Sequence, residues 1–182
     1  MRIISGSFKG KKIIAPASLP VRPTTDFAKE ALFNVLNNHY DFDEISVLDL
    51  FSGIGSIGLE FVSRGSQRVV SVDIHPDCVK FLSETIKKMN LDDKFTVIRS
   101  DAFEFLKRAS QGFDVVYLDP PYDFVQSQYN ELIELIESNN FLNLGGELIV
   151  EHPRNIDFKN HVHLLQSRKY GKVHFSFFDF EQ

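Results

Sequence analysis

The chain has 182 residues, of which 43% are hydrophobic and 25% charged, and its formal net charge is −5. This composition is typical of a soluble protein whose single domain buries a full core, and the negative charge argues against a uniformly basic nucleic-acid binder. No apolar stretch approaches the roughly 20 residues that span a membrane, and the first residues lack the apolar core of a signal peptide. The single cysteine, Cys78, excludes an internal disulfide. We therefore expect a cytoplasmic protein that contacts no membrane.

The N-terminal segment is basic, whereas the rest of the chain is acidic. Residues 1–25 contain five Lys and Arg and no acid, so they carry +5 and the remainder carries −10. Isoleucine pairs flank two glycines, a pattern that predicts a hairpin with Lys9, Lys11 and Lys12 near its tip. A basic hairpin on an acidic body indicates contact with a polyanion. A plain solvated hairpin explains the charges equally well at this point.

A helix is predicted next, followed by alternating strands and helices. Thr24-Thr25-Asp26 offers N-cap side chains, and the predicted buried face consists of Phe27, Ala31, Leu32, Val35 and Leu36. The predicted strands are Ile45–Phe51, Arg68–Asp73, Phe95–Arg99, Phe113–Leu118 and Glu147–Glu151, with helices beginning near Pro76 and Val125. This alternation indicates a parallel sheet covered by helices on both faces.

The C-terminal region has a different pattern. Apolar residues alternate at period two on either side of Tyr170-Gly171, namely Val162 and Leu164, then Val173, Phe175 and Phe177. This pattern predicts an antiparallel hairpin that closes the parallel sheet. We divide the chain into a hairpin-and-helix extension, residues 1–40, and a main α/β domain, residues 41–182.

A glycine-rich loop follows the first predicted strand. Gly53-Ile54-Gly55-Ser56-Ile57-Gly58 fits the G-x-G-x-x-G pattern that lets a backbone approach a ligand closely. Asp73 ends the second strand, where a carboxylate can bind the hydroxyls of a ribose. These features leave NAD, FAD and S-adenosyl-L-methionine open, together with a glycine turn that serves packing alone.

Two further carboxylates favour S-adenosyl-L-methionine over NAD and FAD. Asp49 lies just before the loop, where a cationic, amino-bearing ligand is favoured and a pyrophosphate is not. Asp101 follows the third strand and can bind an adenine amino group, although with Glu104 it also resembles a helix capping box. Because the carboxyl ends of parallel strands meet at one edge of the sheet, Asp49, Asp73 and Asp101 indicate an acidic site suited to S-adenosyl-L-methionine.

The loop Asp119-Pro120-Pro121-Tyr122 ends the fourth strand at the same edge. The prolines fix φ and remove two N–H donors, so the carbonyls remain acceptors. Asp119 and the Pro120 carbonyl can accept both hydrogens of an NH₂ group, and Tyr122 can stack on a base for about 1–3 kcal/mol. The loop therefore predicts methyl transfer to an exocyclic amine. Whether Asp119 accepts the proton or only positions the amine stays open, and a rigid turn without chemistry is the alternative.

Several motifs together resemble one family. Asp119–Tyr122 resembles the Asp/Asn/Ser-Pro-Pro-aromatic motif of amino-group methyltransferases, and the segment 49–55 resembles their cofactor motif. With Arg2-Ile3-Ile4-Ser5-Gly6, Lys9-Gly10-Lys11-Lys12 and Arg22-Pro23-Thr24-Thr25-Asp26, the chain is similar nearly end to end to the RsmD family of bacterial guanine-N2 methyltransferases that act on 16S ribosomal RNA. Phe51 stands where the general methyltransferase motif has its first glycine.

The resemblance implies a fold, a site and a partner. The fold is the class I S-adenosyl-L-methionine-dependent methyltransferase (Rossmann-like) fold, with a seven-stranded sheet. The implied cofactor residues are Asp49, Phe51, Gly53, Gly55, Asp73, Ile74, Asp101 and Ala102, and the implied catalytic residues are Asp119, Pro120 and Tyr122. Arg22, Pro23 and Thr24 are implied to lie by the target base, with Lys9, Lys11 and Lys12 on RNA phosphates. The implied substrate is 16S rRNA in an assembling small ribosomal subunit, modified by a monomer.

Other readings remain at this point. A DNA adenine-N6 methyltransferase usually needs an inserted recognition region, and a protein-glutamine methyltransferase favours Asn where this chain has Asp119. An NAD-dependent oxidoreductase explains only the glycine loop, and a non-catalytic RNA-binding module predicts no product. We expect no metal site, because His161 and His163 alternate on a predicted strand without a third ligand. We expect His75 to belong to a turn and the Cys78 thiol to serve packing.

Overall fold

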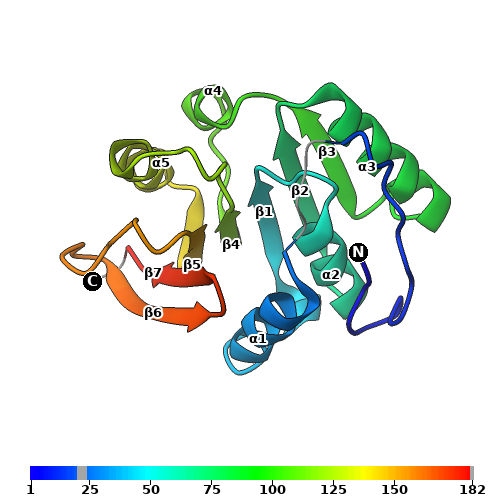
Figure 1. Ribbon diagram of the computed structural model, residues 1–182, viewed down its shortest axis with the longest axis horizontal. Helices are drawn as coiled ribbons and strands as arrows, with labels where there is room; N and C mark the ends of the chain where they lie inside the picture. The colour runs from blue at the N-terminus through cyan, green and yellow to red at the C-terminus, as the bar shows by residue number, and fades with distance from the viewer. Residues whose placement is uncertain (20–23, 181–182) are drawn as a thin grey trace.

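A single seven-stranded sheet forms the centre of the computed structural model, which describes residues 1–19 and 24–180 (Figure 1). The strands are β1 (Ser46–Leu50), β2 (Arg68–Asp73), β3 (Phe95–Arg99), β4 (Phe113–Leu118), β5 (Leu142–His152), β6 (Leu164–Tyr170) and β7 (Val173–Phe178), in the order β3-β2-β1-β4-β5-β7-β6. The pairs from β3 to β5 are parallel, whereas β7 is antiparallel to both of its neighbours. The predicted mostly parallel sheet with a C-terminal antiparallel hairpin is confirmed.

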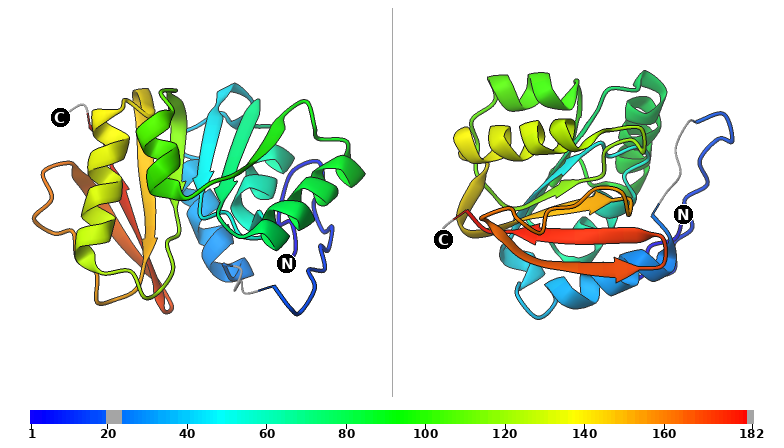
Figure 2. Two further views of the ribbon diagram at one scale, coloured as in Figure 1. Left: turned by 90° about the horizontal axis from the view of Figure 1, so that it is seen from above. Right: turned by 60° about the vertical axis from the view of Figure 1, so that its left-hand side comes forward.

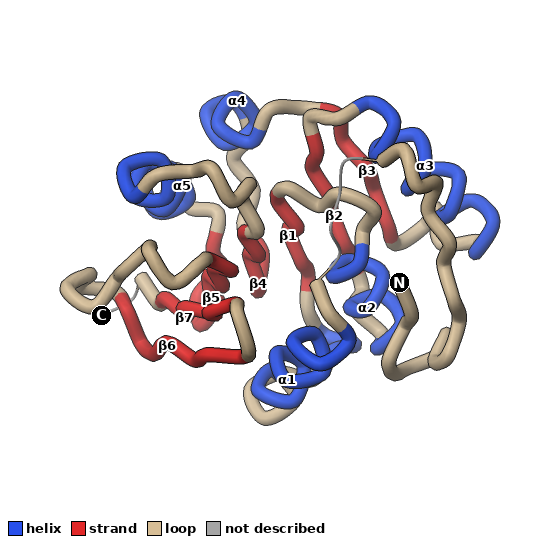
Figure 3. The backbone as a smooth tube through the Cα atoms, in the orientation of Figure 1, coloured by secondary structure: helices blue, strands red, loops and turns tan. Residues whose placement is uncertain are grey.

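Helices cover both faces of this sheet (Figures 2 and 3). The helices are α1 (Asp26–Leu36), α2 (Ser56–Arg64), α3 (Pro76–Met89), α4 (Ala102–Arg108) and α5 (Gln126–Ser138), with a short 3₁₀ helix at Phe42–Glu44. One buried cluster joins the sheet to α1, α2 and α3, and a second joins it to α4 and α5. The central strands are therefore apolar on both sides, which is typical of buried parallel strands.

Two strands differ from the predicted ranges. The first was predicted to run through Phe51, but β1 ends at Leu50 because Phe51 has a φ of 63° and turns the chain away. The fifth was predicted to begin at Glu147, but β5 begins at Leu142, which pairs with Phe113 before the register shifts. Glycines in this segment hide the strand pattern, since glycine is rare in strand interiors.

The prediction that His161, Val162 and His163 lie on a strand is wrong. The His161 carbonyl accepts a hydrogen bond from the Leu164 N–H, and the His161 N–H donates to the Phe158 carbonyl. The chain therefore forms a turn before β6 begins. Val162 is 82% exposed in this turn. Local hydrogen bonding overrides a short alternating pattern here.

The predicted buried face of α1 is also partly wrong. Phe27 is 67% exposed, whereas Phe33 is fully buried against Phe61, with ring centroids 4.7 Å apart. Phe27 lies in the first turn, where it contacts Tyr170 at the end of β6 instead of the core. Phe27 therefore lies on the side of α1 that faces away from the buried cluster.

The N-terminal segment forms the predicted hairpin in a minimal version. A single antiparallel bridge joins Arg2 to Lys12, and the Ile13 N–H donates to the carbonyl of Met1 at 3.0 Å. Ile3 and Ile13 are buried in the same cluster as α1 and α2. The division at residue 40 stays a prediction. No helix in residues 1–19 and 24–180 is long and apolar enough to cross a membrane.

Candidate functional site

A cavity of about 430 Å³ opens at the carboxyl ends of β1, β2 and β4. This volume lies within the range of roughly 300–1,000 Å³ that small-molecule sites occupy. Its lining includes the predicted cofactor residues Asp49, Phe51, Gly53, Asp73, Ile74, Asp101 and Ala102, the predicted catalytic residues Asp119, Pro120 and Tyr122, and Thr24. Gly55 does not line the cavity but belongs to the same loop. The fold therefore brings together residues that are up to 98 positions apart, from Thr24 to Tyr122.

The glycine loop requires its unusual backbone. Gly55 has a φ of 76°, and a Cβ at this position would lie 2.4 Å from Cδ1 of Leu82. Phe51 also has a positive φ, which is rare for a bulky residue. Its ring packs edge-to-face against Phe124, with centroids 5.6 Å apart, and so joins the glycine loop to the loop after β4.

Asp73 and Asp101 already accept backbone hydrogen bonds. The Asp73 carboxylate accepts from the N–H of Gly53 at 2.6 Å and from the N–H of His75 at 2.8 Å, one on each oxygen. A carboxylate oxygen accepts more than one hydrogen bond, so both oxygens retain capacity toward the cavity. Asp101 caps α4 by accepting from the Glu104 N–H at 3.1 Å, so its predicted capping role is confirmed.

Asp49 is only 2% exposed, yet it borders the cavity. One of its oxygens accepts from the N–H of Gly58 at 3.2 Å and from the hydroxyl of Ser71 at 3.3 Å. Burial raises the pKa of Asp49 to about 7, because these two hydrogen bonds compensate only in part for desolvation. A cation in the cavity would stabilise its ionised form.

A carboxylate that sequence reasoning missed lies beside Asp119. Glu151, near the end of β5, is buried and accepts hydrogen bonds from the Tyr117 hydroxyl and from the Thr24 hydroxyl, the latter at 3.2 Å. Burial, then the charges of Glu151 and Asp49, hold the pKa of Asp119 well above its usual range. Burial also raises the pKa of Glu151. The sequence did contain a signal for Glu151, because this charged residue stands at the end of a predicted apolar strand, as Asp49 and Asp119 do.

The loop after β4 is shaped by aromatic packing. The Phe124 N–H donates to the Pro121 carbonyl at 3.0 Å, and the Phe124 ring stacks on Phe103 with centroids 6.2 Å apart. Pro120 is buried, whereas Tyr122 is 64% exposed at the cavity. This arrangement combines fixed acceptors inside the cavity with an aromatic ring near solvent.

The predicted phosphate-contacting lysines do not line the cavity. Lys9, Lys11 and Lys12 are exposed on the N-terminal hairpin, and Lys12 borders a neighbouring open cavity of about 780 Å³ that shares Ile54 with the first. Arg22 and Pro23 lie outside the described residues. Within the described residues, no three His, Cys, Asp or Glu side chains cluster as metal ligands would.

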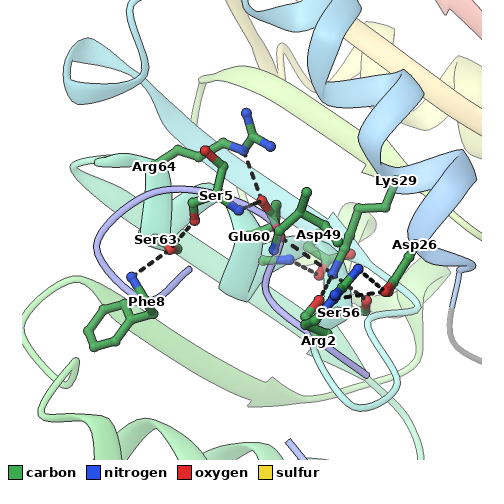
Figure 4. Close-up of polar contacts among 12 residues, drawn as sticks. Arg2, Ser5, Phe8, Asp26, Lys29, Asp49, Ser56, Glu60, Ser63 and Arg64 are labelled. Atoms are coloured by element: carbon green, nitrogen blue, oxygen red, sulfur yellow. Dashed lines mark hydrogen bonds and ion pairs between the residues drawn. The ribbon is translucent and has the colours of Figure 1, made fainter. Parts of the chain in front are cut away.

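A buried ion pair attaches the N-terminal hairpin to α2, the helix that follows the glycine loop (Figure 4). The Lys29 ammonium lies 3.4 Å from the Glu60 carboxylate and donates to the Arg2 carbonyl at 2.7 Å. Glu60 also accepts from the N–H groups of Ile4 and Ser5, at 2.8 and 3.0 Å. Nothing in the local sequence predicts the Lys29–Glu60 ion pair, because Lys29 has the sequence context of a surface lysine on a helix.

Comparisons with known proteins agree with this site. The family model described as Conserved hypothetical protein 95 matches residues 1–179. YlbH of Bacillus subtilis is 35% identical over 173 residues, covering 93% of this chain and 92% of YlbH. Ribosomal RNA small subunit methyltransferase D of Haemophilus influenzae is 33% identical over 154 residues, covering 83% of this chain and 78% of that protein. The solved structure of yhhF from Escherichia coli has a TM-score of 0.85 at 28% identity, covering 98% of this chain and 96% of that chain.

These matches confirm the predicted fold class and enzyme class. The alignments run nearly end to end, from the N-terminal hairpin to the last strand. The chain belongs to the Conserved hypothetical protein 95 family, a family of RsmD-like methyltransferases.

Proposed function

We propose that this enzyme transfers a methyl group from S-adenosyl-L-methionine to the exocyclic N2 amine of a guanine in 16S ribosomal RNA. The observation that carries the proposal is the position of Asp119 and Pro120, which line an acidic cavity beside the glycine loop. A relative named Ribosomal RNA small subunit methyltransferase D supports the choice of RNA. We further propose that the enzyme acts in the cytoplasm as a monomer, on an assembling small subunit, with residues 1–40 contacting RNA.

The cavity residues fit the proposed cofactor. Asp73 offers two oxygens to a ribose diol, and the acidic residues Asp49 and Asp119 favour a ligand with sulfonium and ammonium charges. Among the described residues, the Ser52 hydroxyl and Nδ1 of His75 are buried without a hydrogen-bond partner, and both residues line the cavity. Such orphaned groups are expected where a polar ligand binds. When bound, S-adenosyl-L-methionine would supply an electrophilic methyl group on its sulfonium.

Asp119 and the Pro120 carbonyl would hold the guanine amine by its two hydrogens. The amine nitrogen is a poor nucleophile, because its lone pair is delocalised into the ring. Two acceptors on its hydrogens would favour a tetrahedral nitrogen and orient its lone pair, and we expect most of the rate gain to come from this alignment and from electrostatics. With the cofactor bound, the nitrogen–carbon bond would form as its carbon–sulfur bond breaks, so that S-adenosylhomocysteine would leave and one amine proton would be lost. Asp119 is suited to accept that proton, since its raised pKa makes it a stronger base than an ordinary carboxylate.

Cofactor affinity is expected to depend on the ionisation of Asp49. Because the pKa of Asp49 is raised to about 7 and a cation favours the ionised form, affinity rises as pH increases through that value. Affinity for S-adenosylhomocysteine should increase about tenfold between about pH 5.5 and pH 7. Asp49→Asn should weaken binding at pH 7 and flatten this dependence, measured by calorimetric titration. Parallel pH profiles for the two proteins would contradict the assigned role of Asp49.

The proposed function is tested by methyl transfer from labelled S-adenosyl-L-methionine to unmodified 16S RNA, both free and in 30S particles. We expect label in the RNA of at least one of the two substrates. No label in either, despite binding of S-adenosylhomocysteine, would contradict RNA as the substrate and direct the search to DNA and protein. Binding of NADH in place of S-adenosylhomocysteine would contradict the enzyme's proposed cofactor.

A further inference from the structure

We propose that a second RNA contact lies beside the cavity, on a surface made by Phe27, Arg168, Tyr170 and Lys172. We call this surface the rim platform. It rests on the proposed function, because its ligand would be RNA that flanks the target guanine. The sequence pattern predicts Phe27 as a core residue of its helix, and neither the motifs nor the family resemblance assigns an RNA contact to Arg168, Tyr170 or Lys172.

Strand register places the rim platform at the edge of the sheet where the cavity opens. Lys169 on β6 pairs with His174 on β7, and His174 pairs with His152, the last residue of β5. Glu151 lies one residue before His152 and accepts a hydrogen bond from the hydroxyl of Thr24, which lines the cavity. Because neighbouring strands lie about 4.8 Å apart, β6 is about 10 Å from β5. RNA entering the cavity therefore passes close to the turn between β6 and β7.

Phe27 connects this turn to the cavity. It lies three residues after Thr24, and its ring contacts Tyr170 edge-to-face, with centroids 6.4 Å apart and planes at 73°. Tyr170 packs in turn on the buried Phe175, with centroids 5.8 Å apart. Figures 1 and 2 both show the β6–β7 turn beside α1. Phe27 is thus held in place yet 67% exposed, as a stacking surface for an unpaired base must be.

The charges of the rim platform favour a polyanion. Arg168 lies two residues before Tyr170 on β6, and therefore on the same face, and Lys172 lies in the turn that follows; both are exposed. No Asp or Glu occurs between residues 164 and 178. This concentration is unusual in a chain whose net charge is −5. An aromatic ring flanked by cations is the combination that binds single-stranded nucleic acid without reading its sequence. RNA is therefore the occupant that this surface fits.

Basic residues on an edge strand also have a simpler explanation, since they prevent strands of two molecules from pairing. Charge reversal separates the two roles. Arg168→Glu/Lys172→Glu would keep the edge charged and so still oppose strand pairing, but it would repel phosphates. Under the simpler explanation, this variant would bind RNA as the original protein does.

The test measures KM and kcat with 30S particles, and equilibrium binding of protein-free 16S RNA as a function of salt. Phe27→Ala should raise KM by about 5- to 150-fold, the range expected for loss of one stacked base, while Phe27→Tyr should stay close to the original. Arg168→Glu/Lys172→Glu should lower the slope of log affinity against log salt by about 1.4, equivalent to two phosphate contacts on a single strand. Both variants should retain kcat and the affinity for S-adenosylhomocysteine.

Matched controls come from the opposite end of the molecule. Lys87→Glu/Lys88→Glu makes the same charge change on exposed lysines at the end of α3, and Leu144→Ala truncates a side chain that is 92% exposed in β5. Both controls should change KM by less than about twofold, which is the scale of a surface substitution.

Several outcomes would overturn the rim platform. These are a KM within twofold of the original for both variants, an equal loss in the controls, or a fall in kcat without a change in KM. Weaker binding to 30S particles with unchanged binding to protein-free RNA would assign the surface to a ribosomal protein instead. If the unaltered enzyme transfers no label to any RNA, the proposed function fails; if it does and the variants match it, only the rim platform fails.

Discussion

Replacing Asp119 by Ala is expected to lower the rate of methyl transfer by about 10³-fold or more. The substitution removes the acceptor that aligns the amine and the base that can receive its proton, and general-base catalysis alone contributes about 10²–10⁴-fold. Binding of S-adenosylhomocysteine should survive, because Asp73 and the glycine loop are unchanged. Single-turnover kinetics with a saturating cofactor would measure the effect.

The Asp119 variants also separate positioning from proton transfer. Asp119→Asn keeps one oxygen acceptor but no basic carboxylate, so a residual rate well above that of Asp119→Ala would indicate that positioning dominates. Asp123→Ala, in the same loop and exposed, is the matched control and should retain nearly full activity. An Asp119→Ala enzyme within tenfold of the original would contradict the role assigned to this loop.

Removing Asp119 should at the same time stabilise the protein without its cofactor. Its pKa is raised in the folded state, so at pH values above the usual range of an aspartate the charge opposes folding. Thermal unfolding of the cofactor-free protein at about pH 8 should therefore occur at a higher temperature for Asp119→Ala. A lower unfolding temperature would contradict the electrostatic description of the cavity.

The second large effect is expected at the buried pair of Lys29 and Glu60. Lys29 is 1% exposed and Glu60 is fully buried. Replacing Glu60 by Leu would leave the Lys29 charge unpaired and two backbone N–H groups, those of Ile4 and Ser5, without their acceptor. We expect a loss of about 3–5 kcal/mol in the free energy of unfolding, the usual result of breaking a buried pair. Denaturant titration would measure it.

The two single substitutions should differ. Lys29→Met should be the milder, because Glu60 keeps Arg64, 3.0 Å away, and its two backbone donors. The double substitution should lose less than the sum of the single ones, since the buried Lys29 charge is no longer left without Glu60. The exposed pair of Lys107 and Glu131 is the control and should contribute less than about 1 kcal/mol. Equal, additive losses at Lys29 and Glu60 would show that the two do not act as a pair.

The sequence was most informative where one physical rule governs many residues. Strands buried on both faces are continuous apolar runs in the sequence, so β2 and β4 have the predicted bounds. The edge strand β3 also has them. The carboxyl ends of such strands meet at one edge, which is why Asp49, Asp73, Asp101 and Asp119 could be grouped before any coordinates and all line the cavity. The wrong assignments, such as the burial of Phe27, concern where an element meets its neighbours.

What could not be predicted depends on long-range contacts. The Thr24 hydroxyl donates a hydrogen bond to Glu151, which is 127 residues away in the chain, and no local sequence pattern predicts this contact. Lys29 and Glu60 come from different helices, and only their packing shows that both are buried. The raised pKa of Asp119 likewise follows from desolvation and from Glu151 and Asp49 on neighbouring strands. Composition gives the charges of these groups but not their separations.

The most direct test of the central claim is the identity of the methylated nucleoside. Unmodified 30S particles are incubated with the enzyme and S-adenosyl-L-methionine, and their 16S RNA is digested and analysed by mass spectrometry. The account predicts N2-methylguanosine, formed by the original enzyme and absent with Asp119→Ala. Methyl groups on adenine, on a ring nitrogen of guanine or on ribose would contradict it, because Asp119 and Pro120 would then not be holding the guanine N2 amine.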